Sequence, residues 1–286
     1  DLVEEVARIA ILTKLQGAAM ARAQPGVPRP ILTPLQIRER SARRTIAALG
    51  YNECVTYSFI DGKAAALFGG GMDAVRVDNP ISSEMTHLRP DLLPGLLAAA
   101  ARNQARGFMD LALFEVGPAF HGGEPGDQHI QAAGLLVGAA AGRDPHGSRR
   151  MVDVFDAKAD AEAVLAALGA PARTQISRKL ADWWHPGRSG VIGLGPNTLA
   201  SFGEVHPRVC QAMDVKGPAV AFTVLVANVP APKVKTPTRP ALTISDLQAV
   251  DRDFAFVVDA RIEALTAVNA AQGADKTLIE SVRVFD

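Results

Sequence analysis

The stretch from Trp183 to Val209 contains residue types that carry out catalysis in many enzymes. His185 and His206 could exchange protons near neutral pH, and Glu204 could orient a histidine or act as a base. Arg188 could stabilise a developing negative charge. The same side chains also suit structural roles, in which His206 begins a helix and His185 and Arg188 satisfy backbone carbonyls or neighbouring carboxylates. We favour the structural interpretation, with a hydrolase that uses a His/Glu pair as the rival.

Signatures that would support the rival are missing from the sequence. No serine or cysteine lies in a GxSxG elbow, and there is no HExxH motif. The six histidines are scattered without metal-ligand spacing. There is no βαβ dinucleotide fingerprint and no GxxxxGK[ST] motif, and Gly69–Gly71 is best interpreted as a loop. No catalytic and no cofactor-binding residue is therefore predicted in this chain.

Three carboxylates lie close together at the start of the sequence. Asp1, Glu4 and Glu5 are spaced at i, i+3 and i+4 and share one side of a predicted helix. They form either a solvated acidic face, which suits a helix start, or a set of oxygen ligands of the kind that Mg²⁺ prefers. The chain begins inside this helix without a methionine, so we interpret it as a piece of a longer protein.

Two other groups of residues could contact nucleic acid. Lys233, Lys235 and Arg239 form a local basic stretch, which is either a solvated linker or a contact to a nucleic-acid backbone. Trp183 and Trp184 could stack on bases. Adjacent residues of a strand face opposite ways, however, so at least one of the two tryptophans is expected in the core.

Composition restricts the class of protein. The 286 residues are 48% hydrophobic and 21% charged, which allows a substantial core. Lysine plus arginine equals aspartate plus glutamate at 30 each, so any basic site must be local. Cys54 and Cys210 have no CxxC spacing and are expected to be free thiols, which fits a reducing cytoplasm. No apolar run is long enough to span a membrane, and no secretory signal is present.

The hydrophobic periodicity predicts a mixture of helices and mainly antiparallel strands. Helices are predicted over 1–10, 34–49, within 89–107, and over 155–169, 206–213 and 261–273. Strands are predicted over 54–59, 111–117, 133–140, 173–178, 190–194, 198–205, 217–229, 251–260 and 278–286.

Local signals set several of the predicted boundaries. Thr33, Pro34 and Gln36 form a capping box at the start of the second helix, and Gly50 ends it. Asp156 is the predicted cap of the helix over 155–169. In the strand over 54–59, Val55, Tyr57 and Phe59 share one face, and we expect the strand to be half-buried.

The order of several long motifs resembles that of one family. DNPISSEMTHLRPDLLPGLL (78–97), LALFEVGPAF (111–120), WWHPGRSG (183–190) and FGEVHPRV (202–209) resemble the beta subunit of bacterial phenylalanyl-tRNA synthetase. DLQAVDRDFAFVVD (246–259) resembles the start of its ferredoxin-like anticodon-binding domain, and DLVEEVAR (1–8) the last helix of the small domain before its catalytic-like domain.

The resemblance implies an α+β fold with a class II aminoacyl-tRNA synthetase-like antiparallel sheet flanked by helices. It implies the end of a small domain and a linker over 1–30 and a catalytic-like domain over 31–229. A linker over 230–242 and a partial ferredoxin-like domain over 243–286 would follow. It also implies that the helix and strand over 34–59 take part in a subunit interface.

The function implied is that of a non-catalytic module of phenylalanine–tRNA ligase. In this family two alpha and two beta subunits assemble, and the alpha subunit binds ATP and carries the active site. Asp1, Glu4 and Glu5 match an Asp-x-x-Glu-Glu motif that is associated with a Mg²⁺ shared with the alpha subunit. A further aspartate of that motif would precede Asp1.

The positions that match the class II motifs lack the arginines that the reaction needs. Residues Leu113 to Phe120 contain none, and the strand over 217–229 is not glycine-rich and has no Glu-Arg pair. Adenylation without them would lose several kcal/mol of transition-state stabilisation. The alternative function is a stand-alone RNA-binding protein built on a synthetase-like domain.

Overall fold

A computed structural model of the chain describes residues 1–21, 31–142, 144–147, 149–178, 181–231, 241–242 and 244–285. The chain divides into two compact units, Asp1–Pro34 and Leu35–Asp286. In the part of the chain described here, no helix has the length and apolar character needed to cross a bilayer.

The first unit begins with a continuous helical segment. It consists of α1 (Leu2–Val6), the π-helical turn η1 (Ala7–Ile11) and the 3-10 turn η2 (Leu12–Lys14). The helix predicted over 1–10 is confirmed. Its apolar side chains Leu2, Val6 and Ile9 are all largely exposed.

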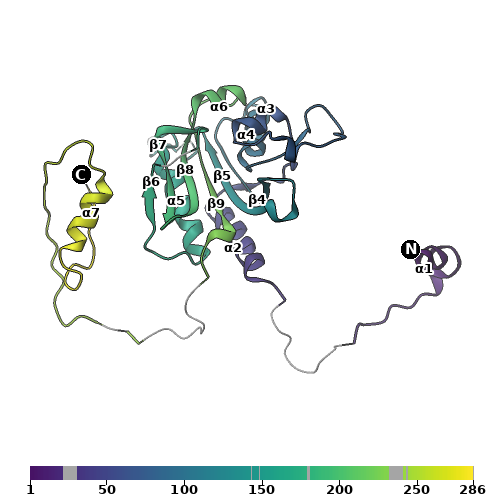
Figure 1. The fold of residues 1–286 in the computed structure, drawn as a ribbon, viewed down its shortest axis with the longest axis horizontal. Coiled ribbons are helices and arrows are strands. Elements are labelled where there is room, and N and C mark those ends of the chain that lie inside the picture. The colour runs from purple at the N-terminus through teal and green to yellow at the C-terminus, as the bar shows by residue number, and fades with distance from the viewer. Residues whose placement is uncertain are drawn as a thin grey trace. The chain divides into compact units, whose positions relative to one another are not determined.

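The second unit is built on a seven-stranded sheet with the order β1-β4-β5-β9-β8-β7-β6 (Figure 1). The strands are β1 (Asn52–Glu53), β4 (Leu111–Phe120), β5 (Gln128–Val137), β6 (Gln175–Ser177), β7 (Trp184–Leu194), β8 (Asn197–Val205) and β9 (Ala219–Leu225). Only the β1–β4 pair is parallel, and every other pair is antiparallel. The predicted antiparallel α+β architecture is confirmed.

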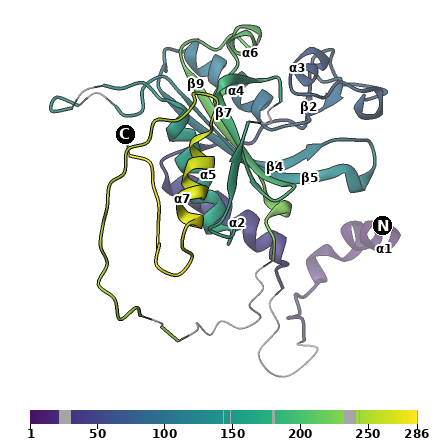
Figure 2. The same cartoon turned by 60° about the vertical axis from the view of Figure 1, so that its left-hand side comes forward.

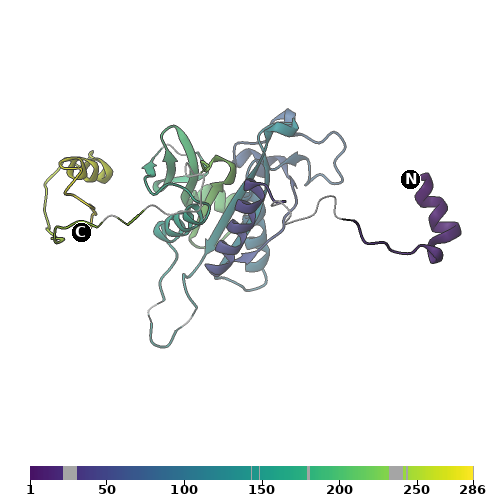
Figure 3. The same ribbon diagram turned by 90° about the horizontal axis from the view of Figure 1, so that it is seen from below.

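Helices α2 (Pro34–Ala48) and α5 (Val154–Ala167) cover the first face of the sheet (Figure 3). Even-numbered residues of the central strands, such as Phe114 and Phe222, pack against them. Helix α2 begins at Pro34 and is followed by Gly50, whose φ of +98° is readily adopted by glycine. The predicted start of this helix is therefore confirmed, and the helix ends one residue before the predicted residue 49.

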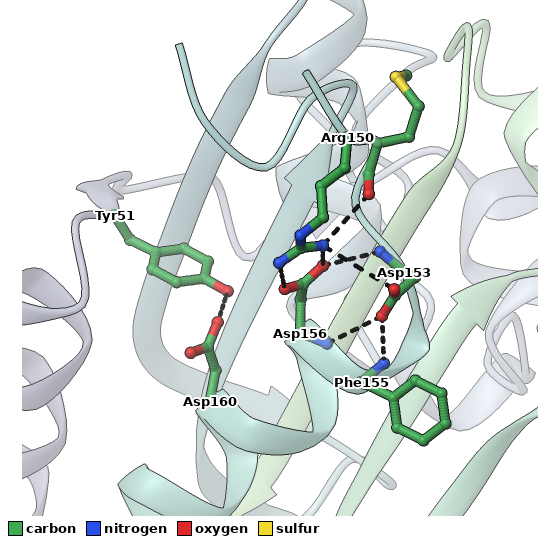
Figure 4. Close-up of polar contacts among 7 residues, drawn as sticks. Tyr51, Arg150, Asp153, Phe155, Asp156 and Asp160 are labelled. Atoms are coloured by element: carbon green, nitrogen blue, oxygen red, sulfur yellow. Dashed lines mark hydrogen bonds and ion pairs between the residues drawn. The ribbon is translucent and has the colours of Figure 1, made fainter. Parts of the chain in front are cut away.

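The cap of α5 differs from the prediction. Asp153, not Asp156, is the N-cap, and it accepts hydrogen bonds from the backbone of Phe155 and Asp156 (Figure 4). Asp156 completes the capping box by accepting from the Asp153 backbone, and it also binds Arg150 at 2.6 Å. The two aspartates stand three residues apart, so either could serve as the cap, and the chain path ahead of the helix decides between them.

A tyrosine joins α5 to the sheet. Tyr51 is buried, and its hydroxyl donates to Asp160 at 2.5 Å (Figure 4). Its ring meets Phe222 edge to face at 6.0 Å. A side chain on Gly134 would overlap the Phe222 ring, so this glycine makes room for the aromatic pair. Burial and the nearby Asp160 carboxylate both raise the pKa of the Tyr51 hydroxyl.

We expect Tyr51→Phe to lower the free energy of unfolding by about 1 to 3 kcal/mol. The ring still packs in the variant, but the Asp160 carboxylate loses a hydrogen-bond donor. Urea denaturation followed by circular dichroism measures the difference. Tyr57→Phe is the matched control, because Tyr57 is 73% exposed and its hydroxyl stays in water. Equal stability of the Tyr51 variant and the wild type would contradict the expectation.

Helices α3 (Gly62–Leu67), α4 (Leu93–Gln104) and α6 (Pro207–Ala212) pack with the second face of the sheet (Figure 2). Odd-numbered strand residues such as Leu113 and Leu135 form this second core with Leu96 of α4. The predicted place of Pro94 in the first turn of α4 is confirmed, and Gly107 follows its end with a φ of +93°.

The strand predicted over 54–59 is wrong in part. The structure has only β1 before it and the two-residue β2 (Phe59–Ile60), which pairs with β3 (His87–Leu88). The alternation itself is present, but the apolar side chains of Val55 and Tyr57 point outward at 92% and 73% exposure. The polar side faces inward because Thr56 is hydrogen-bonded within the second face.

The C-terminal segment contains one of its three predicted elements. Helix α7 (Ala264–Gly273) is present, whereas the described residues of 251–260 and 278–285 form no strand. Phe254, Phe256 and Val257 are at least 70% exposed. Strands of this kind need hydrogen-bonding partners and a covered apolar face, and this segment supplies neither. The prediction of the two strands of this βαβ unit is therefore wrong, whereas its helix is present.

Candidate functional site

The second face of the sheet contains a buried ion pair. Arg89, from the segment before α4, is 1% exposed and donates to Glu115 of β4 at 2.8 Å. The same nitrogen donates to the Thr56 hydroxyl at 2.9 Å, and that hydroxyl donates to Glu115 at 2.7 Å. Gly117 leaves room for the guanidinium, whose Nε donates to the carbonyl of Pro118 at 2.9 Å. The two charges thus satisfy each other in a site without open access to solvent.

A second polar group lies beside the start of α4. Asp91 accepts from the backbone of Leu93 at 2.9 Å, and burial raises the pKa of its carboxyl to about 6. Gln131 of β5 is 2% exposed and accepts from the backbone of Leu92 at 3.3 Å. These groups form hydrogen bonds that are internal to the fold on the second face of the sheet.

Two stacked histidines lie at the loop end of the β4–β5 hairpin. The rings of His121 and His129 have centroids 4.0 Å apart. Gln131 Nε2 lies 2.8 Å from His129 Nε2, and the Gln131 oxygen is engaged by Leu92, so the amide donates to the ring. His129 is therefore protonated on Nδ1, which is buried without a partner among the described residues. Burial, followed by the neighbouring His121, lowers the pKa of His129 to about 4.

The shift of His129 predicts a pH dependence of stability. The unfolded chain takes up this proton near the ordinary pKa of about 6.5, and the folded chain only near 4. The stability that the neutral His129 ring contributes is complete above the pKa of the unfolded chain. It is lost as the pH falls from 6.5 to about 4. The raised pKa of Asp91 acts in the opposite sense in part of this range, since the folded state there binds the extra proton.

Comparing the wild type with His129→Gln isolates the histidine, because Asp91 is common to both proteins. We expect the stability difference between wild type and variant to shrink steadily from pH 7 to pH 4 in urea denaturation. His146→Gln, at an exposed loop position, is the control variant. A constant difference for His129→Gln would contradict the assigned pKa.

The stretch from Trp183 to Val209 has the structural roles favoured from the sequence. Arg188 forms a two-point ion pair with Glu204, with Nη2 to Oε1 at 2.9 Å, and this pair lowers the pKa of the glutamate. His206 is the N-cap of α6 and accepts from the backbone of Arg208 at 3.2 Å. His185 accepts from the backbone of Gly187 at 3.1 Å, so it caps a turn instead of serving a carbonyl.

Both tryptophans belong to the packed interior, and no base-stacking pair is formed by them. Trp184 is 2% exposed, and Trp183 packs on Phe68 with ring centroids 5.7 Å apart. The expectation that at least one lies in the core is confirmed. Cys54 and Cys210 are free thiols, as expected. Burial raises the pKa of Cys210 to about 11, which makes it a poor nucleophile although it lines a cavity of about 390 Å³ beside α6.

The acidic residues at the chain start lie around the first turn of the helix. Asp1 precedes α1, and Glu4 and Glu5 lie in its first turn. Glu5 is engaged by Arg8 at 2.6 Å. In the residues that the structure describes, no group of three or more histidine, cysteine, aspartate or glutamate side chains could hold a metal ion. The carboxylates fit Mg²⁺ in chemical type, but these three alone do not form a complete site.

The basic stretch of Lys233, Lys235 and Arg239 lies outside the described residues. Sequence reasoning missed the buried Arg89–Glu115 pair, which joins residues 26 positions apart. The alternation over 54–59 was a sequence feature that could have indicated this pair. It sets Thr56, which contacts both residues, on the opposite side from Val55 and Tyr57.

Comparison with protein families gives a match over most of the chain. Residues 23–225 match the model of the phenylalanyl tRNA synthetase beta chain CLM domain. The whole chain is 79% identical to part of the phenylalanine–tRNA ligase beta subunit of Cereibacter sphaeroides and 69% identical to that of Ruegeria pomeroyi. It spans 36% of the length of each of these relatives.

Solved structures with a similar fold include a pyrrolysyl-tRNA synthetase from Desulfitobacterium hafniense. The superposition has a TM-score of 0.53 at 16% identity and covers 80% of this chain and 72% of that one. At this identity the likeness concerns the fold alone. The sheet and its flanking helices thus share the fold of the matched part of that structure.

Proposed function

Because the chain belongs to the phenylalanyl-tRNA synthetase beta chain family, we propose that it is a non-catalytic module of a ligase that charges tRNA with phenylalanine. In this role it supports the active site of a separate alpha subunit, and that alpha subunit also binds ATP. The beta subunits that this chain resembles are about three times as long, so the activity is assigned to the assembled enzyme.

The observation that carries the non-catalytic part of the proposal is the filled second face of the sheet. Arg89 is already hydrogen-bonded to Glu115 and Thr56. Gln131 is already hydrogen-bonded to the backbone at the start of α4. An adenylation site needs cationic groups that are free to meet phosphate oxygens in a closed pocket. The buried arginine of this layer, Arg89, is already neutralised and is 1% exposed.

An exposed apolar stripe supports the proposed association with the alpha subunit. Val55 and Tyr57 project from the segment between β1 and β2, and Phe59 continues the row at 42% exposure. The inward side of this segment is fixed by Thr56, so the apolar side stays on the surface. Aromatic and aliphatic side chains of this kind form the centres of subunit interfaces. The proposed assembly contains two alpha and two beta subunits.

We further propose that Asp1, Glu4 and Glu5 contribute oxygen ligands to a Mg²⁺ ion shared with the alpha subunit. These carboxylates do not complete a site by themselves, so the remaining ligands must come from elsewhere in the assembly. The free thiols Cys54 and Cys210 suit the reducing cytoplasm in which tRNA is charged.

The proposal predicts that this chain alone shows no phenylalanine-dependent ATP–pyrophosphate exchange. The expected rate equals that of a buffer blank, whereas the full-length beta subunit purified with its alpha subunit supports exchange and tRNA charging. Exchange by the chain in preparations free of alpha subunit would refute the non-catalytic assignment. Failure of the full-length subunit to co-purify with an alpha subunit would instead favour a stand-alone RNA-binding protein.

A further inference from the structure

A cavity of about 320 Å³ lies where β7 begins and α6 starts its first turn. Its lining includes Arg178, Asp182, Trp184, His206 and Arg208. The two arginines come from different parts of the chain, one directly after β6 and the other from α6. None of these residues has a part in the buried network of the second face.

Positive charge predominates among the described residues that line this cavity. The charged side chains there are Arg178, Arg208 and Asp182. Among the described residues, no acceptor engages the Arg208 guanidinium, whereas the nearby Arg188 is paired with Glu204. Arg178 lies 3.6 Å from Glu263, but both side chains are largely exposed, and such pairs exchange readily for other ligands.

The hydrogen bonds of His206 make it a donor to this cavity. Its Nδ1 accepts from the Arg208 backbone at 3.2 Å, so the proton of the neutral ring lies on Nε2. This arrangement also holds the ring in place, because the same contact caps α6. His206 can therefore donate a hydrogen bond to an anion without being charged.

Trp184 supplies an apolar wall at 2% exposure. An apolar wall lowers the local dielectric constant and strengthens the attraction between a guanidinium and an anion. Planar guanidinium groups bind phosphate oxygens with two parallel hydrogen bonds. The cavity thus combines two guanidinium groups, a neutral N–H donor and an apolar wall. This combination suits the recognition of a phosphate group.

We propose that this cavity binds one phosphate of an RNA backbone. The non-bridging oxygens of a phosphodiester are acceptors that suit guanidinium groups and a neutral N–H donor. The choice of RNA rests on the proposed function, in which the assembled enzyme binds tRNA. Such a contact positions the RNA and does not read its sequence.

The test is the salt dependence of tRNA binding by the holoenzyme, measured with filter binding for the wild type and for Arg178→Gln/Arg208→Gln. One lost phosphate contact lowers the slope of log K against log salt by about 0.7 to 1. Arg173→Gln is the matched control, since Arg173 is exposed close to β6 but does not line the cavity. The loss is expected to be equal for matched and mismatched tRNA.

A second measurement distinguishes RNA from free phosphate. Isothermal titration with inorganic phosphate is performed on the wild-type and double-variant holoenzymes. An unchanged salt slope overturns the inference, and phosphate binding that only the wild type retains would then identify a free anion as the occupant. If the wild type charges tRNA while both slopes agree, the proposed function stands and only this inference fails. A wild-type complex that binds no tRNA would overturn the proposed function as well.

Discussion

Glu115→Ala is expected to lower the free energy of unfolding by about 3 to 5 kcal/mol. The substitution leaves the Arg89 guanidinium buried at 1% exposure without its counter-charge. Thr56 loses its acceptor in the same step. Burying an unpaired charge costs far more than the intact pair contributes, because the pair offsets the desolvation of both partners.

The measurement is urea denaturation of Glu115→Ala, of Arg89→Met and of the double variant Arg89→Met/Glu115→Leu. We expect the double variant to be clearly more stable than Glu115→Ala, because it buries two apolar side chains in place of one unpaired charge. Glu84→Ala, at an exposed turn position, controls for the general loss of a glutamate. A loss below about 1 kcal/mol for Glu115→Ala would show that the Arg89 charge is solvated.

Gly203→Ala is expected to destabilise the sheet by about 3 kcal/mol or more, from backbone strain and overpacking together. Gly203 has a φ of +151°, which side chains rarely allow. An added Cβ would also overlap Ser189 and the carbonyl of Arg188 across the strand pair. Here β7 has a register shift between Trp184 and Ser189, and the close approach of β8 leaves no space.

Gly126→Ala is the matched control, because a Cβ there meets no atom within 4 Å and its φ is ordinary. Thermal unfolding of both variants by circular dichroism tests the expectation. The melting temperature should fall by many degrees for Gly203→Ala and change little for Gly126→Ala. Similar melting temperatures would show that the β7–β8 pair can move apart to accept the methyl group.

Local chemistry made part of this fold predictable. Pro34 begins α2, and Gly50 and Gly107 take positive φ after α2 and α4, because each residue acts within one turn of itself. The cap of α5 was placed three residues late because Asp153 and Asp156 are chemically interchangeable in a capping box. Local signals therefore found the elements better than their ends.

Contacts between distant residues could not be predicted in this way. The alternation over 54–59 was correctly identified, yet its buried side is the polar one, since Thr56 meets Arg89 and Glu115 from other elements. Strand β7 begins at Trp184, well before the predicted residue 190, because a register shift carries it past Pro186 and Gly187. The phosphate-type cavity around Arg208 likewise depends on residues that only the fold brings together.

The outward row of Val55, Tyr57 and Phe59 has a consequence for the life of the protein in the cell. A newly made copy without a partner exposes an apolar segment. Chaperones bind segments of this kind, and aggregation can start from them. In the proposed association, the alpha subunit covers the row and protects the copy from both fates. The amount of this protein is then expected to follow the supply of its partner, with surplus copies removed by proteolysis.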